Sequence, residues 1–144
     1  MALHLIKLCV GAESIQDLEE WIDQRMAERR KRGERTHSLH VTRMTPKRVD
    51  ELLRGGSLYW VIRGLVAARQ ELKDIETFTD AEGIGRCRLW MDPKVTPVLA
   101  RPYRPFQGWR YLTAKDAPPD LAGRSAIAEM PEAMRRELTG LGLL

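Results

Sequence analysis

The feature that most constrains the fold is a β-rich stretch in the middle of the chain. Three short segments with the composition of strands, 58–62, 71–78 and 84–91, follow one another there. Turn residues separate them, including Gly83 and the pair Asp92-Pro93. Short strands that are joined by turns pair with their neighbours, so this stretch predicts an antiparallel meander or a small barrel.

Helical patterns lie on the N-terminal side of this stretch. Residues 15–32 place apolar side chains at helical spacing, with Ser14 as the N-cap and Gly33 as the stop after a run of cations. A second helix is predicted to start at Thr45-Pro46, with the threonine as N-cap, and to end at the glycine pair 55–56.

The remaining segments complete an expected α+β fold. Further strands are predicted at 3–10 and 36–44, and a last helix at 131–138. The six prolines between 93 and 119 exclude a central strand over most of that stretch, which predicts short edge strands or an ordered loop. We therefore expect a small, mostly antiparallel β-barrel or meander flanked by two or three helices. Residues 1–144 are expected to form a single domain.

Charge is concentrated in the first half of the chain. The net charge is only +4, but residues 25–54 contain ten Lys or Arg against four Asp or Glu. Arginine outnumbers lysine 18 to 6. A planar guanidinium binds phosphate and stacks on bases better than an ammonium does, so a partner with phosphate groups is expected. The alternative is a GC-rich genome, which would enrich arginine without functional meaning.

The cysteines and the apolar runs indicate the compartment. Cys9 and Cys87 lie in separate apolar runs, as small buried thiols do, and no secretory signal is recognisable before them. Free thiols indicate a reducing environment. The apolar runs are much shorter than the roughly 20 residues that cross a bilayer. We therefore expect a cytoplasmic protein that does not bind membranes.

The segment 101–111 is the strongest candidate for a binding site, because three arginines and four aromatic residues interleave there without an acid. Cations beside stacking platforms are what single-stranded nucleic acid requires. We expect single-stranded RNA or another nucleic acid as the partner, with arginines on phosphates and Tyr103 or Trp109 on a base. In the alternative, the aromatic side chains only hold a proline-rich loop on the core. The arginines of the segment are Arg101, Arg104 and Arg110.

Other candidate chemistry is weaker. His37 and His40 point to opposite faces of a strand and have no third ligand near them in sequence, so no metal and no other cofactor is expected. No sequence motif identifies a nucleophile or a paired acid and base, so a binding protein is favoured over an enzyme. The rival hypothesis is an enzyme on nucleic acid or a nucleotide, with Glu71, His40 or His37 at the mouth of the barrel. A homo-oligomeric scaffold is the third hypothesis, and the sequence does not fix an oligomeric state.

Six segments across nearly the whole chain resemble an alphaproteobacterial family, domain of unknown function 1489. This resemblance implies no activity. The segments are LHLIKLCVG (3–11), GSLYWVIRG (56–64), ARQ (68–70), GIGRC (83–87), PFQGWRYL (105–112) and DAPPDL (116–121).

A second resemblance is to the PUA-like pseudobarrels, which include the ASCH and EVE domains and bind RNA or modified bases. The order of the 60–64 strand, a turn at Arg69-Gln70 and a β-rich half is similar to their pattern. Enzymes of the ASCH type use a lysine early in the barrel with an acid nearby. Here Arg63 occupies that place, with Arg69 and Glu71 beyond it. An arginine stays protonated and is a poor general base, so this difference favours binding over hydrolysis, with Arg63 and Arg69 as further nucleic-acid contacts.

Overall fold

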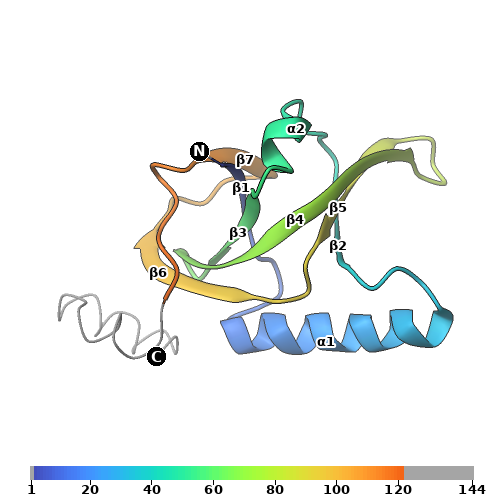
Figure 1. Cartoon of the computed structure of the whole chain (residues 1–144), viewed down its shortest axis with the longest axis horizontal. Helices are drawn as coiled ribbons and strands as arrows, with labels where there is room; N and C mark the ends of the chain where they lie inside the picture. Colours follow the sequence, from blue (N-terminus) through green and yellow to red (C-terminus); the bar gives the residue numbers. More distant parts are fainter. Residues whose placement is uncertain (1, 122–144) are drawn as a thin grey trace.

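The computed structural model of the chain describes residues 2–121, and the helix predicted at 131–138 lies outside the described residues. Helices and strands combine in an α+β arrangement (Figure 1). The helices are α1 (Ile15–Arg32) and α2 (Val49–Leu52), and the strands are β1 (Leu3–Leu8), β2 (Ser38–Thr42), β3 (Ser57–Ile62), β4 (Leu65–Thr79), β5 (Gly85–Met91), β6 (Thr96–Pro102) and β7 (Trp109–Thr113).

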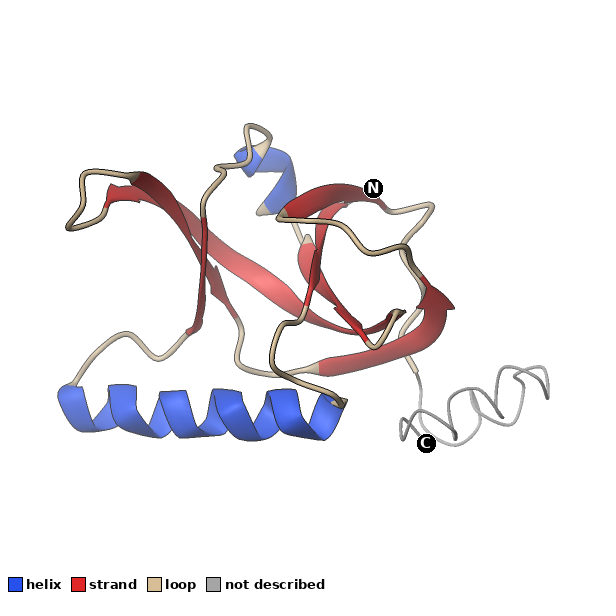
Figure 2. Cartoon of the chain, turned by 180° about the vertical axis from the view of Figure 1, so that it is seen from behind, coloured by secondary structure: helices blue, strands red, loops and turns tan. Residues whose placement is uncertain are grey.

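The strands form one open, strongly bent sheet (Figure 2). Their order is β2-β5-β4-β3-β1-β7, and β6 pairs with β4 beside this path. All pairs are antiparallel except that of β1 with β3. β2 and β7 are therefore the edge strands at the two ends of this path, and β6 is a third edge strand. Of the two predicted arrangements, a barrel or a meander, the barrel is wrong, because no backbone ladder joins β2 to β7 within residues 2–121. A PUA-like topology is not supported.

The long strand β4 connects two parts of the sheet. β3 and β6 pair with its N-terminal part, and β5 pairs with the rest, with a register shift between Leu72 and Asp74. Residues 74–90 form the β4–β5 arm, whose hairpin end extends beyond β2 (Figure 1). The predicted turn at Arg69-Gln70 is wrong because this pair lies inside β4. The turn is Arg63-Gly64, whose φ angles of 52° and 79° suit a two-residue hairpin.

Helix α1 has the predicted range and the predicted caps. The Asp17 backbone N–H donates to Ser14 Oγ over 3.1 Å, and Gly33 takes the left-handed conformation with φ 68°. The helix lies alongside the bent sheet (Figure 1). It buries Leu18, Ile22 and Met26. This apolar stripe holds α1 on the sheet, because burial of such side chains is the main stabilising term.

Apolar side chains form two cores on opposite faces of β1 and β3. Successive strand residues point to opposite faces, so Leu5 and Leu58 belong to the first core and Ile6 and Tyr59 to the second. The first core also receives the side chains of α1. The second core is covered by β6 and by the loop 103–106. The loop in the candidate segment is therefore anchored to a core.

Helix α2 is shorter than predicted, and its predicted N-cap is wrong. The N-cap is Arg48, and Thr45-Pro46 lies in the loop that leads from β2 to the helix. In this loop the backbone N–H groups of Lys47 and Arg48 donate to the Tyr111 hydroxyl over 3.0 and 3.2 Å. A tertiary contact with β7 thus supplies the acceptor for two N–H groups at the start of this short helix.

Candidate functional site

The edge strands β2 and β7 meet through side chains of β7. Trp109 Nε1 donates to the Met44 carbonyl over 2.7 Å, two residues after β2 ends. Tyr111 adds its hydrogen bonds to the loop before α2. We call these contacts the seam. They connect β2 to β7 at the point where a closed barrel would have a backbone ladder.

A cleft of about 610 Å³ lies at the seam. A cleft of this volume is in the usual range for small-molecule sites. Of the large apolar side chains exposed by residues 2–121, Val41 and Met44 line it, at 41% and 61% exposure. Three cations line it as well, and no Asp or Glu of the described part of the chain does. The lining residues are Lys7, Val41, Thr42, Arg43, Met44, Gln107, Gly108, Trp109 and Arg110.

The three cations of the cleft come from three strands or strand ends. Lys7 lies on β1, Arg43 directly follows β2, and Arg110 lies on β7. Within residues 2–121, none of the three has a carboxylate within 4 Å. Arg110 is held by its Nη1, which donates to the carbonyls of Gln107 and Trp109 over 2.9 and 3.0 Å. The cleft is therefore a concentration of positive charge.

Lys7 is the least solvated of these cations. Its side chain is half-buried, and burial lowers the pKa of its ammonium. Among the described residues it faces no carboxylate that would reverse this shift. An incoming anion stabilises a half-buried ammonium more than it stabilises a fully hydrated surface lysine, because less water screens the interaction.

His40 lies on the inner face of β2, beside the cleft. Ser38 and Thr42, on the same face, are buried. Burial, with the positive charges of Lys7 and Arg25, lowers the pKa of His40 to about 4. Its Nε2 is buried and has no hydrogen-bond partner in residues 2–121. The ring is therefore neutral near pH 7, and it packs edge-on against Trp60 with the centroids 5.2 Å apart.

The structure divides the predicted binding segment. Arg110 and Trp109 line the cleft, but Trp109 is only 9% exposed and belongs to the first core. Only a small part of its side chain is accessible, and its core packing and its hydrogen bond to Met44 are structural contacts. Arg101 and Tyr103 line a separate hollow of about 290 Å³, in which Arg101 Nη1 donates to the Asp116 carbonyl over 2.7 Å. Arg104 is exposed and lines neither hollow.

Tyr103 is part of the architecture of the loop. Its ring is half-buried against the second core and meets Phe106 edge-on, with the centroids 5.3 Å apart. Its backbone N–H donates to the Gly64 carbonyl over 2.9 Å, so the loop is attached to the β3–β4 turn. Arg63, at this turn, is exposed and lies outside the cleft.

Arg69 has a structural partner. Its Nε and Nη2 donate to the two carboxylate oxygens of Asp120 over 2.7 and 2.8 Å, and its Nη1 donates to Ser57 Oγ over 2.9 Å. The hydrogen bonds to Asp120 raise the pKa of Arg69 and lower that of the carboxyl. This bidentate pair fixes residues 119–121 beside β6, and it occupies the donors that a phosphate would need.

The residues of the enzyme hypothesis do not converge. Glu71 is exposed and forms an ion pair with Lys73 over 3.3 Å. His37 Nδ1 accepts a hydrogen bond from Arg35 Nε over 3.1 Å. His40 lines a hollow of about 30 Å³ under α1 that contains neither of the other two. In the part of the chain that the structure describes, no three His, Cys, Asp or Glu side chains are grouped to hold a metal ion.

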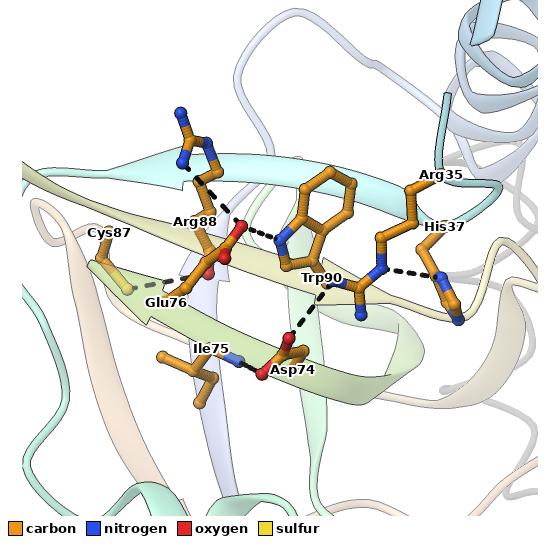
Figure 3. Close-up of polar contacts among 8 residues, drawn as sticks. All are labelled: Arg35, His37, Asp74, Ile75, Glu76, Cys87, Arg88 and Trp90. Atoms are coloured by element: carbon orange, nitrogen blue, oxygen red, sulfur yellow. Dashed lines mark hydrogen bonds and ion pairs between the residues drawn. The ribbon is translucent and has the colours of Figure 1, made fainter. Parts of the chain in front are cut away.

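Cations near the β4–β5 arm are neutralised locally (Figure 3). Arg35 Nη1 lies 3.2 Å from Asp74 Oδ2, and its guanidinium lies 4.5 Å from the centroid of the Trp90 ring. Arg88 Nη1 lies 3.8 Å from Glu76 Oε1, which also accepts a hydrogen bond from Trp90 Nε1 over 2.6 Å. These arginines already have carboxylate partners, whereas those of the cleft have none within residues 2–121.

Sequence reasoning missed Lys7, Arg43 and the apolar side chains of the cleft. One signal was available, because Lys7 is the single charge in the apolar run 3–10. Nothing local connects this run with Arg43 or with the 101–111 segment, since the three meet only through the bent sheet.

Two further findings concern the thiols and the helices. Both Cys9 and Cys87 are free and buried, and burial raises the pKa of Cys9 to about 11. None of the helices among residues 2–121 has the length and apolar character needed to cross a membrane.

Comparison with known proteins gives one match. The model of a family described as "Protein of unknown function (DUF1489)" matches residues 5–144. No curated protein and no solved structure matches the chain.

Proposed function

The chain belongs to the family of proteins of unknown function DUF1489, and from the geometry of its own residues we propose that it binds single-stranded nucleic acid, RNA above all. The observation that supports this proposal is the cleft at the seam. It combines three cations that lack a carboxylate partner within residues 2–121 with two exposed apolar side chains, Val41 and Met44.

Each part of the cleft suits one part of a nucleotide. Phosphate oxygens would accept hydrogen bonds from Arg43, Arg110 and Lys7. A base would lie against the apolar side chains, which accept any base because the contact does not read its edge. Unpaired bases are accessible in a single strand, whereas an RNA duplex presents its backbone and a shallow groove. These features favour a single strand over a duplex.

The strand would continue from the cleft over the loop 103–106. Arg104 and Arg101 are exposed along this path and would contact further phosphates. Tyr103 would stack on a base with the half of its ring that the second core leaves open. Trp109 has no role as a stacking platform in this proposal, because its ring is buried. The proposed compartment is the cytoplasm, where free thiols such as Cys9 and Cys87 persist.

Fluorescence anisotropy with a labelled single-stranded RNA tests the proposal. Arg43→Gln and Arg110→Gln should each weaken binding and make the log-log salt dependence shallower by roughly 0.7. Arg88→Gln is the matched control, because it removes the same charge from a side chain that is already paired. The proposal is wrong if the wild-type protein binds RNA no better than a charge-matched control protein at about 50 mM salt.

A further inference from the structure

We infer that the cleft binds the terminal phosphate of a single strand, a phosphate monoester, rather than an internal phosphodiester. This assignment of a ligand rests on the proposed function and adds a chemical class to it. Three features of the described residues support it: the number of cations, the half-burial of Lys7 and the seam contact between Trp109 and Met44.

The charge of the cleft matches a monoester better than a diester. A phosphodiester carries one negative charge, whereas a terminal phosphate carries about −1.5 to −2 at pH 7. Lys7, Arg43 and Arg110 line one cleft without a carboxylate from residues 2–121. A single negative charge would leave most of this positive charge uncompensated, whereas a dianion with three equivalent oxygens can accept from all three side chains.

The position of Lys7 favours a ligand that reaches into the cleft. Its ammonium is half-buried on β1, while Arg43 and Arg110 are exposed at the edges of the sheet. An internal phosphate has sugars on both sides, and both would have to enter the cleft with it. A terminal phosphate projects from the end of the strand and can approach Lys7 alone.

The seam is part of the lining of the cleft. Trp109 and Met44 both line the cleft, and the 2.7 Å hydrogen bond between them joins its two sides. A continuous strand that enters the cleft would have to pass this contact, whereas a strand that ends in the cleft would not. The rest of the strand can leave past Arg110, whose guanidinium lies 5.4 Å from the centroid of the Phe106 ring and so leads to the loop 103–106.

The test compares forms of one short RNA that differ only at their ends. A 5′-phosphorylated, a 3′-phosphorylated, an unphosphorylated and a circular form are titrated by anisotropy. One of the two phosphorylated forms should bind about tenfold more tightly than the unphosphorylated and circular forms, as expected for added charge-assisted hydrogen bonds.

Variants separate the terminal site from general binding. Lys7→Met and Arg43→Gln should remove the preference for the phosphorylated end. Arg104→Gln should weaken all forms alike and preserve the ratio. Arg43 and Arg104 are exposed, so both glutamine variants are expected to fold, and melting curves check this.

The outcomes distinguish the two proposals. If all forms bind with affinities within about twofold of one another, the terminal-phosphate site is wrong and general RNA binding stands. If no form binds, the proposed function itself is wrong. If a free nucleoside monophosphate competes as strongly as the phosphorylated strand, the ligand is a nucleotide and the assignment to a strand end is overturned.

Discussion

Arginines lie in two regions of this molecule whose charge environments are opposite. Near the β4–β5 arm, Arg35 and Arg88 lie beside Asp74 and Glu76 and over aromatic rings. At the seam, Arg43 lies in a cleft to which no described residue contributes a carboxylate. The comparison teaches that the count of arginines says little about binding. What matters is whether the fold supplies each guanidinium with an internal partner.

The arm also shows why aromatic neighbours are not a sufficient criterion. The Arg88 guanidinium lies 3.7 Å from the centroid of the Phe78 ring, a close cation–π contact. An arginine over an aromatic ring is also typical of a nucleic-acid site. Here, however, Glu76 forms an ion pair with the same arginine. At the cleft the aromatic residue Trp109 is buried, and the arginines are not neutralised.

The largest expected effect concerns the seam that makes the cleft. Trp109→Ala should lower the free energy of unfolding by about 3 to 5 kcal/mol, because it removes a buried ring and leaves the Met44 carbonyl without its donor. Urea denaturation measures this change. Trp21→Ala is the control: this ring is 39% exposed, so the loss should be much smaller. Equal losses in the two variants would contradict the structural role of the seam.

The second effect is a dependence of stability on pH that arises beside the cleft. The pKa of His40 is about 4 in the folded state against an ordinary value of 6.5. The neutral His40 ring therefore stabilises the folded state fully above pH 6.5. This stabilisation, up to about 3 kcal/mol, is lost as the pH falls from 6.5 to about 4. Denaturation at pH 7 and at pH 4.5 measures it. His40→Leu should flatten this part of the profile, and His37→Gln should not; an unchanged profile in His40→Leu would refute the assignment.

The third effect tests an arginine that has a partner. Arg69→Met should lower the free energy of unfolding by about 1 to 2 kcal/mol, because Asp120 and Ser57 lose hydrogen bonds from a charged donor. RNA affinity should stay unchanged, because these donors are already occupied. Arg43→Met should give the reverse result, with little change in stability and weaker binding. Melting and anisotropy on the same two samples decide the comparison.

The smallest effect has the opposite sign. Lys7→Met should raise the free energy of unfolding by about 0.5 to 1 kcal/mol, because it removes a half-buried charge that faces no carboxylate of residues 2–121. The same variant should bind RNA more weakly. A lysine whose removal destabilised the protein would have a structural role, and the cleft would lose one of its proposed contacts.

Local signals predicted the fold where local chemistry decides it. The caps of α1 at Ser14 and Gly33 and the turn at Gly83 form as the sequence indicates, because each depends on neighbouring residues alone. The predicted start of α2 was wrong, because the Tyr111 hydroxyl of β7, more than sixty residues away in the sequence, accepts a hydrogen bond from the backbone at this start. The openness of the sheet also depends on contacts between distant strands, which no local pattern records.

The candidate site was predicted only in part. The 101–111 segment was identified from its composition, and it contributes Arg110 to the cleft. The spacing of its aromatic residues is the same whether they pack on the core or stack on bases. The burial of Trp109 could therefore not be predicted from the sequence. Lys7 and Arg43 come together with this segment only because β1 and β7 are neighbours and β2 is the opposite edge.

The pairing of β1 has a consequence during synthesis. The first strand of the chain lies between β3 and β7 in the finished sheet, and Leu5 faces Tyr111 across the second of these ladders. A ribosome that adds about 5 to 20 residues per second needs roughly 5 to 20 seconds to travel from β1 to the end of β7. During this time the apolar run of β1 has only β3 to pair with. The nascent chain therefore exposes an open strand edge on β1 until β7 has been synthesised, and during this time the edge is available to chaperones.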